Sequence, residues 1–177
     1  MKSTKNLSAS VRQRLLNRSK TDKRPFNELL QYYAMERFLY RLSKSNYAGH
    51  YILKGALMLR AWRSPEFRAT MDIDMLGRTS NEETKIVAQI RDIIALDVDS
   101  DGLVFDPDSI QTEQITEDAD YEGIRIRFRG LLGTARINMQ IDIGFGDIIY
   151  PGPEEADLPT MLNSPAITSW RPAGPWL

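Results

Sequence analysis

The stretch 124-IRIRFRGLLGTARINMQIDIGFG-146 decides the fold. Apolar and polar residues alternate through both of its halves, which is the pattern of strands with one buried face. The short connection at residues 130–134 carries glycine and predicts a hairpin between the two strands. Because each strand has one apolar and one polar face, we expect a sheet covered by helices on one side and open on the other.

A shorter strand, 71-MDIDM-75, shows the same alternation and carries two aspartates. Asp72 and Asp74 are two residues apart, so their side chains share one face of that strand. Asp142 sits between two isoleucines and belongs to the polar face of the second hairpin strand. If the two strands are neighbours, three carboxylates converge, and hard divalent metals accept such an all-oxygen site. The alternative is a solvated sheet face, although aspartate is uncommon in strands.

The flanking segments predict helices, further short strands and an irregular tail. Helices are expected over residues 8–20, from Pro25 to a break at residues 46–49, over residues 56–62, and from a capping-box pattern at residues 80–83 to Ile94. Strands are expected over residues 51–53 and 110–115, and loops over residues 63–68 and 97–108. Six of the nine prolines follow residue 150, so we expect irregular structure there, with irregular or disordered chain from about residue 164.

The composition excludes several kinds of site. The chain has 177 residues, no cysteine and a single histidine, His50. It therefore has no disulfide scaffold and no zinc–thiolate site, and a histidine-rich metal site or a histidine-based triad is not expected. No apolar run suits a signal peptide or a membrane span, so a cytoplasmic protein without a membrane partner is expected.

The charges are divided along the chain. Residues 1–68 hold 15 basic and 4 acidic residues, whereas the remainder is acidic, and the net charge is −1. This division indicates one surface for polyanions such as RNA and another for cations, or two halves that neutralise each other across an internal interface. Arg125, Arg127 and Arg129 share the open face with Asp142; they either bind phosphates or balance the carboxylates, and balance is favoured.

Two further features suit phosphate groups. Lys54, Gly55 and Ala56 stand between a predicted strand and a predicted helix, where glycine lets the backbone approach a phosphate and the helix offers N–H donors. A tight turn alone would also require this glycine. Arg68 and Thr70 lie on the same side of an extended segment as the first aspartate, and Arg68 suits a triphosphate or a nearby carboxylate.

Together these motifs resemble a known family. The strings 51-YILKGALML-59, 68-RATMDIDML-76 and 141-IDIGFGD-147 resemble the AbiEii/AbiGii toxin family of nucleotidyltransferases, within the superfamily related to DNA polymerase β. The resemblance spans roughly residues 7–162. It implies an α+β fold with a mixed or antiparallel sheet, helices on one face and preceding N-terminal helices. We divide the chain into an N-terminal basic helical segment (1–50), a nucleotidyltransferase core (51–150) and a proline-rich tail (151–177).

The resemblance also implies an activity. A nucleotide would pass from an NTP to an acceptor hydroxyl, of RNA or tRNA, in a toxin of a toxin–antitoxin or abortive-infection system with a cognate antitoxin. The implied ligands of Mg²⁺ (or Mn²⁺) and catalytic residues are Asp72, Asp74 and Asp142. The implied phosphate-binding residues are Lys54, Gly55, Ala56, Arg68 and Thr70.

Two departures from the family pattern open alternatives. Ala56 replaces a common serine, and family members usually continue into a helical half that carries a catalytic lysine and aspartate, whereas this chain stops at Leu177. We therefore expect a truncated member. The alternative function is an inactive module that binds RNA or an antitoxin, and a weaker third reading is a D-x-D glycosyltransferase.

Overall fold

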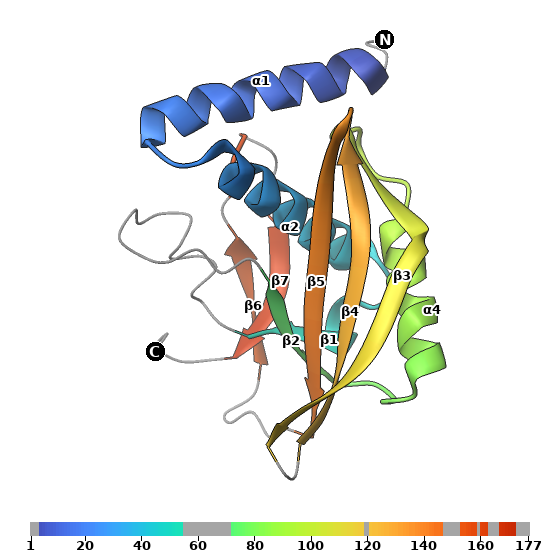
Figure 1. Ribbon diagram of the computed structural model, residues 1–177. Coiled ribbons are helices and arrows are strands. Elements are labelled where there is room, and N and C mark those ends of the chain that lie inside the picture. The colour runs from blue at the N-terminus through green and yellow to red at the C-terminus, as the bar shows by residue number, and fades with distance from the viewer. Residues whose placement is uncertain are drawn as a thin grey trace.

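The computed structural model describes residues 4–54, 72–118, 121–146, 153–158, 160–162 and 167–172 (Figure 1). Its helices are α1 (Thr4–Asp22), α2 (Phe26–Lys44) and α4 (Glu83–Ile94), with a short 3₁₀ turn, η1 (Ala48–His50). Its strands are β1 (Tyr51–Leu53), β2 (Ile73–Gly77), β3 (Leu103–Asp118), β4 (Tyr121–Leu132), β5 (Ala135–Phe145), β6 (Pro153–Leu158) and β7 (Ile167–Pro172). Within these ranges, no helix combines the length and apolar character needed to cross a membrane.

The main sheet has five strands in the order β1-β2-β5-β4-β3. Among the strands that the structure describes in this sheet, β2 and β5 run parallel to each other and the other neighbouring pairs are antiparallel. The predicted hairpin is confirmed, with a two-residue turn between Leu132 and Ala135. Gly133 begins this turn at a φ of +62°, a conformation that glycine adopts without steric cost. The predicted α+β fold with preceding N-terminal helices is therefore confirmed.

The two faces of this sheet differ as the alternation predicted. The isoleucine and methionine side chains of one face are buried in the core, where α2 and α4 pack on that face, while α1 packs against α2 at the end of the sheet near the hairpin turn. Phe38 of α2 stands against Phe128 and Phe105, with ring centroids 5.8 and 6.5 Å away. Arginine, aspartate and amide side chains of β4 and β5 point to the opposite face, which Figure 1 shows toward the viewer.

Charged residues lie inside the helical layer because they are paired. Arg37 and Arg41 of α2 are buried, and both donate hydrogen bonds to the carboxylate of Asp101, at 2.8 and 2.9 Å. The Tyr33 hydroxyl donates to the Asp101 carbonyl at 2.7 Å. Burial of charges is tolerated when they are hydrogen-bonded to one another. This cluster fixes the segment that leads into β3 against α2.

A second buried acid holds the C-terminal region. Glu36 is fully buried, and its Oε1 atom accepts a hydrogen bond from the Met161 N–H at 2.6 Å. Arg18 of α1 donates to the Met161 carbonyl. Burial raises the pKa of Glu36 to about 7, although the Met161 hydrogen bond and the Arg37 charge act in the opposite direction. Residues 160–162 are thus anchored to both N-terminal helices.

Three local expectations were wrong. The loop expected over residues 97–108 ends at residue 102, because Leu103 and Phe105 are buried and begin a strand that also contains the predicted strand at 110–115. The capping box does not form: the Ser80 hydroxyl accepts the N–H of Glu82, and the helix begins at Glu83 without a side-chain cap. In the proline-rich tail, residues 153–158 and 167–172 pair as antiparallel strands, so that part is not irregular.

Two expectations lie wholly outside the described residues. The helix at residues 56–62 and the loop at 63–68 fall in the range 55–71. The strand expected to begin at Met71 begins at Ile73, so Asp72 lies just before it.

Replacing Phe38 by alanine should lower the free energy of unfolding by about 3–5 kcal/mol, because the fully buried ring fills the space between α2 and the sheet. Urea denaturation measures this loss. Val104→Ala is the control: this side chain is 55% exposed, and its loss should change stability by no more than about 0.5 kcal/mol. Equal effects of the two substitutions would contradict the assignment of Phe38 to the core.

The buried Glu36 predicts a pH dependence of stability. Its pKa is raised from 4.5 to about 7, so between these values the folded chain holds the proton more tightly than the unfolded chain. The free energy of unfolding should therefore fall, by about 3 kcal/mol at most, as the pH rises through this window. Glu36→Gln keeps an oxygen acceptor for Met161 and should lose less stability between pH 5 and pH 8. Parallel pH profiles from urea denaturation of both proteins would contradict this role.

Candidate functional site

The pairing of β2 with β5 brings the predicted aspartates together. Asp74 stands directly opposite Asp142 in the parallel register, while Ile73 and Ile141 form the adjacent pair in the core. Asp72 lies just before β2, and its Oδ2 atom accepts a hydrogen bond from the side-chain amide of Gln140 at 3.2 Å. The three acids therefore lie on the same open face of the sheet, on neighbouring segments.

A line of charged residues crosses the sheet at this level. The backbone N–H of Lys54 donates to the Asp74 carbonyl at 2.8 Å, which extends the β1–β2 pairing by one residue. On the other side, Arg125 is opposite Asp142 and Glu113 is opposite Arg125. We call this set the charged row; in order across the sheet it contains Lys54, Asp74, Asp142, Arg125 and Glu113.

Arg125 is the main partner of Asp142. Its Nε and Nη2 atoms donate to the two carboxylate oxygens at 2.8 and 3.0 Å, a bidentate arrangement that suits the planar guanidinium. These hydrogen bonds raise the pKa of Arg125. Arg127 donates to Glu113 at 3.2 Å, and Arg129 lies 3.9 Å from Asp106. The interpretation that these arginines balance the carboxylates is confirmed for Arg125, whereas Arg127 and Arg129 pair with exposed acids outside the aspartate cluster.

The environment of Asp72 disfavours a bare negative charge. Burial raises the pKa of Asp72, and the nearby charge of Asp142 raises it further, while Arg125 and Arg127 lower it. A carboxylate in such surroundings gains from a proton or from a cation beside it.

The acids fit a divalent cation in part. Carboxylate oxygens are the ligands that Mg²⁺ and Mn²⁺ prefer, and Asp72 and Asp74 offer them on one face. Both oxygens of Asp142, however, are occupied by Arg125. Over the described ranges, no three His, Cys, Asp or Glu side chains are arranged to hold a metal ion. The residues present fit a cation at Asp72 and Asp74, and the pair with Arg125 makes Asp142 a weaker ligand because the guanidinium offsets its charge.

One of the five predicted phosphate-binding residues is described. Lys54 follows β1, and a Cβ built on Gly144 would lie 3.3 Å from its Nζ atom. Since Gly144 is two residues from Asp142 on β5, the Lys54 ammonium lies on the open face near the acids. The other four, Gly55, Ala56, Arg68 and Thr70, lie outside the described residues.

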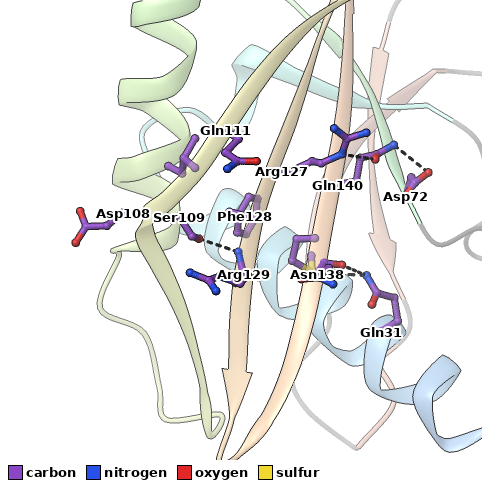
Figure 2. Close-up of a pocket in the computed structure, with 12 residues that line it drawn as sticks. Gln31, Asp72, Asp108, Ser109, Gln111, Arg127, Phe128, Arg129, Asn138 and Gln140 are labelled. Carbon is purple, nitrogen blue, oxygen red and sulfur yellow. Dashed lines mark hydrogen bonds between the residues drawn. The ribbon is translucent and has the colours of Figure 1, made fainter.

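A cavity of about 800 Å³ opens on the same face, next to Asp72 (Figure 2). Sequence reasoning did not single out most of the polar side chains around it. Those it missed are Gln31, Ser109, Gln111, Asn138 and Gln140. Alternation along β5 places Asn138 and Gln140 on the open face and was a usable signal. No local pattern indicates that Gln31, from α2, reaches the edge of β5.

One of three comparisons with known proteins identifies a family. A family model described as "Nucleotidyl transferase AbiEii toxin, Type IV TA system" matches residues 37–173, which run from the middle of α2 through β7. The chain has no significant match among curated proteins or among solved structures. The family match covers more than half of the chain and includes both strands that carry the aspartates. The chain therefore belongs to the AbiEii nucleotidyltransferase toxin family of type IV toxin–antitoxin systems.

Proposed function

We propose that the protein is a metal-dependent nucleotidyltransferase toxin that transfers a nucleotide from an NTP to a hydroxyl of RNA, with tRNA as the first acceptor to test. The register pair Asp74–Asp142 beside Asp72 carries this proposal, because it concentrates oxygen ligands on an open sheet face. Attack of the acceptor oxygen on the α-phosphorus forms the new phosphodiester bond and releases pyrophosphate. Family membership supports a cognate antitoxin as a further partner.

The residues of the charged row suit different parts of this reaction. Asp72 and Asp74 would hold Mg²⁺ or Mn²⁺, which when bound supplies positive charge to the phosphate oxygens and the attacking hydroxyl. The ammonium of Lys54, close to the acids, suits the donor phosphates together with Gly55, Ala56, Arg68 and Thr70. Asp142 is proposed as the third ligand or the base once it separates from Arg125.

One observation favours a second function, an inactive module that binds RNA or an antitoxin. The bidentate contact of Arg125 satisfies Asp142 without any cation, and Lys54 lies close to the same acids. A row balanced in this way is stable in a protein that performs no chemistry. The two functions differ in whether a divalent cation can replace Arg125 as the partner of Asp142.

Asp72→Asn and Asp74→Asn should each reduce nucleotide transfer by about a thousandfold or more, because each removes charge that holds the metal ion. The assay incubates the protein with Mg²⁺, tRNA and each labelled NTP in turn, and EDTA should abolish the signal. Asp99→Asn, in the exposed loop before β3, is the matched control and should leave transfer unchanged. Absence of transfer by the wild-type protein with all four nucleotides would favour the inactive module.

Arg125→Gln should raise the affinity for Mn²⁺ by about tenfold, because it frees both oxygens of Asp142 from a charge-assisted pair. Calorimetric titration with Mn²⁺ measures this directly, without any enzymatic turnover. Arg136→Gln removes the same charge from an exposed position near the hairpin turn and serves as control. An Mn²⁺ affinity that is unchanged or weaker in Arg125→Gln would show that Asp142 is not a metal ligand.

A further inference from the structure

The cavity next to Asp72 has a wall built by an irregularity of β3. Asp106 pairs with Arg129 and Gln111 pairs with Arg127, so residues 107–110 of β3 stand opposite a single residue of β4. Hydrogen bonds fix this bulge: the Ser109 hydroxyl accepts the Arg129 N–H at 2.9 Å and donates to the Asp106 carbonyl at 2.7 Å. Bulges of this kind are frequent beside functional sites, where they re-aim side chains.

The opposite wall comes from a helix. β2 pairs with β5 from Ile141 onward. The part of the β5 edge that precedes Ile141 is therefore not paired with β2. Gln31 of α2 reaches this edge and donates to the Asn138 carbonyl at 2.7 Å (Figure 2). The cavity therefore lies between a hydrogen-bonded bulge and a helix side chain, with β4 and β5 as its floor.

The floor offers two kinds of polar group. The first kind is the pair of guanidinium groups of Arg127 and Arg129, whose side chains are half exposed. Their acid partners, Glu113 and Asp106, are also exposed, and such surface pairs are weak enough for a phosphate to replace them. Arg127 and Arg129 are two residues apart on β4, so their side chains share one face and their Cα atoms lie about 6.6 Å apart. This spacing suits successive phosphates of an extended polynucleotide chain.

The second kind of group is the side-chain amide. Gln111 and Asn138 are exposed in the cavity, and within the described ranges neither amide group has a hydrogen-bond partner. An amide donates and accepts at once, which is the chemistry that recognises the edges of nucleobases. Arginines spaced along a strand and amides beside them form a surface for phosphates and bases together.

We propose that this cavity binds the acceptor: a single-stranded polynucleotide whose phosphates contact Arg127 and Arg129 and whose bases contact Gln111 and Asn138. Asp72 marks the end of the cavity next to the charged row, so the terminal hydroxyl of the bound strand lies toward the acids. The volume of about 800 Å³ lies in the upper part of the usual range for ligand pockets, about 300–1,000 Å³. The acceptor role rests on the proposed function, whereas binding of the strand does not require transfer.

Binding of a fluorescein-labelled single-stranded RNA with a free 3′ hydroxyl, followed by anisotropy at several salt concentrations without metal or NTP, tests the proposal. Arg127→Gln with Arg129→Gln should weaken binding at least tenfold and lower the salt slope by about 2. Arg12→Gln with Arg14→Gln removes the same charge from the exposed side of α1 and should change affinity less than threefold. Equal losses in both double variants, or a loss only in the α1 variant, would overturn the proposal.

Two further variants keep the test decisive. Arg127→Lys with Arg129→Lys retains the charge and should keep most of the salt slope, which separates phosphate contact from a folding defect. Gln111→Ala with Asn138→Ala should leave the salt slope unchanged but alter the preference among RNAs with different terminal sequences. Unchanged preference, or no measurable binding of RNA by the wild-type protein, would overturn the proposal.

Two controls distinguish binding of a polynucleotide in this cavity from binding of a mononucleotide and from the transfer reaction itself. A mononucleotide that displaces the RNA as effectively as unlabelled RNA does would make the cavity a mononucleotide site and overturn the proposal. Asp72→Asn with Asp74→Asn should abolish transfer but not weaken RNA binding. A wild-type protein that binds RNA through Arg127 and Arg129 yet transfers no nucleotide would support this inference and count against the proposed function.

Discussion

The parallel pairing of β2 with β5 is the contact on which the rest of the site depends. Side chains alternate along a strand, so the register that seats Ile73 beside Ile141 in the core also sets Asp74 beside Asp142 outside it. A shift by one residue would expose the isoleucines and bury the acids, at a cost that the fold would not tolerate. The apolar core thus fixes the position of the polar groups to within one residue.

The neighbouring positive charges then determine how the two aspartates that this register brings together can coexist. Two aspartates side by side repel each other, and this chain offsets the repulsion with Arg125 on one side and with Lys54 close by. The arrangement is self-consistent without a ligand, which explains how an acid pair persists on an otherwise open surface. The role of Asp142 therefore depends on how readily the Arg125 guanidinium is displaced.

Local periodicity predicted the elements, but not their neighbours in space. The hairpin, the long helix after Pro25 and the acidic strand follow from alternation and helical spacing, which act within a few residues. The parallel placement of β2, the bulge after Asp106 and the reach of Gln31 depend on residues far apart in the chain. The prediction of irregular structure in the proline-rich tail was wrong for a related reason. The pairing of β6 with β7 joins residues far apart in the chain and outweighs the local proline content.

The neighbouring strands β2 and β5 are far apart in the sequence, which has a consequence for folding during synthesis from the N-terminus. Asp72 and Asp74 are synthesised well before Asp142, because α4, β3 and β4 come between them in the sequence. Before β5 is made, β2 can pair only with β1, and Asp74 has no Asp142 beside it. The assembled face therefore exists only after β5 has been synthesised and has paired with β2, so the site depends on the completion of most of the sheet.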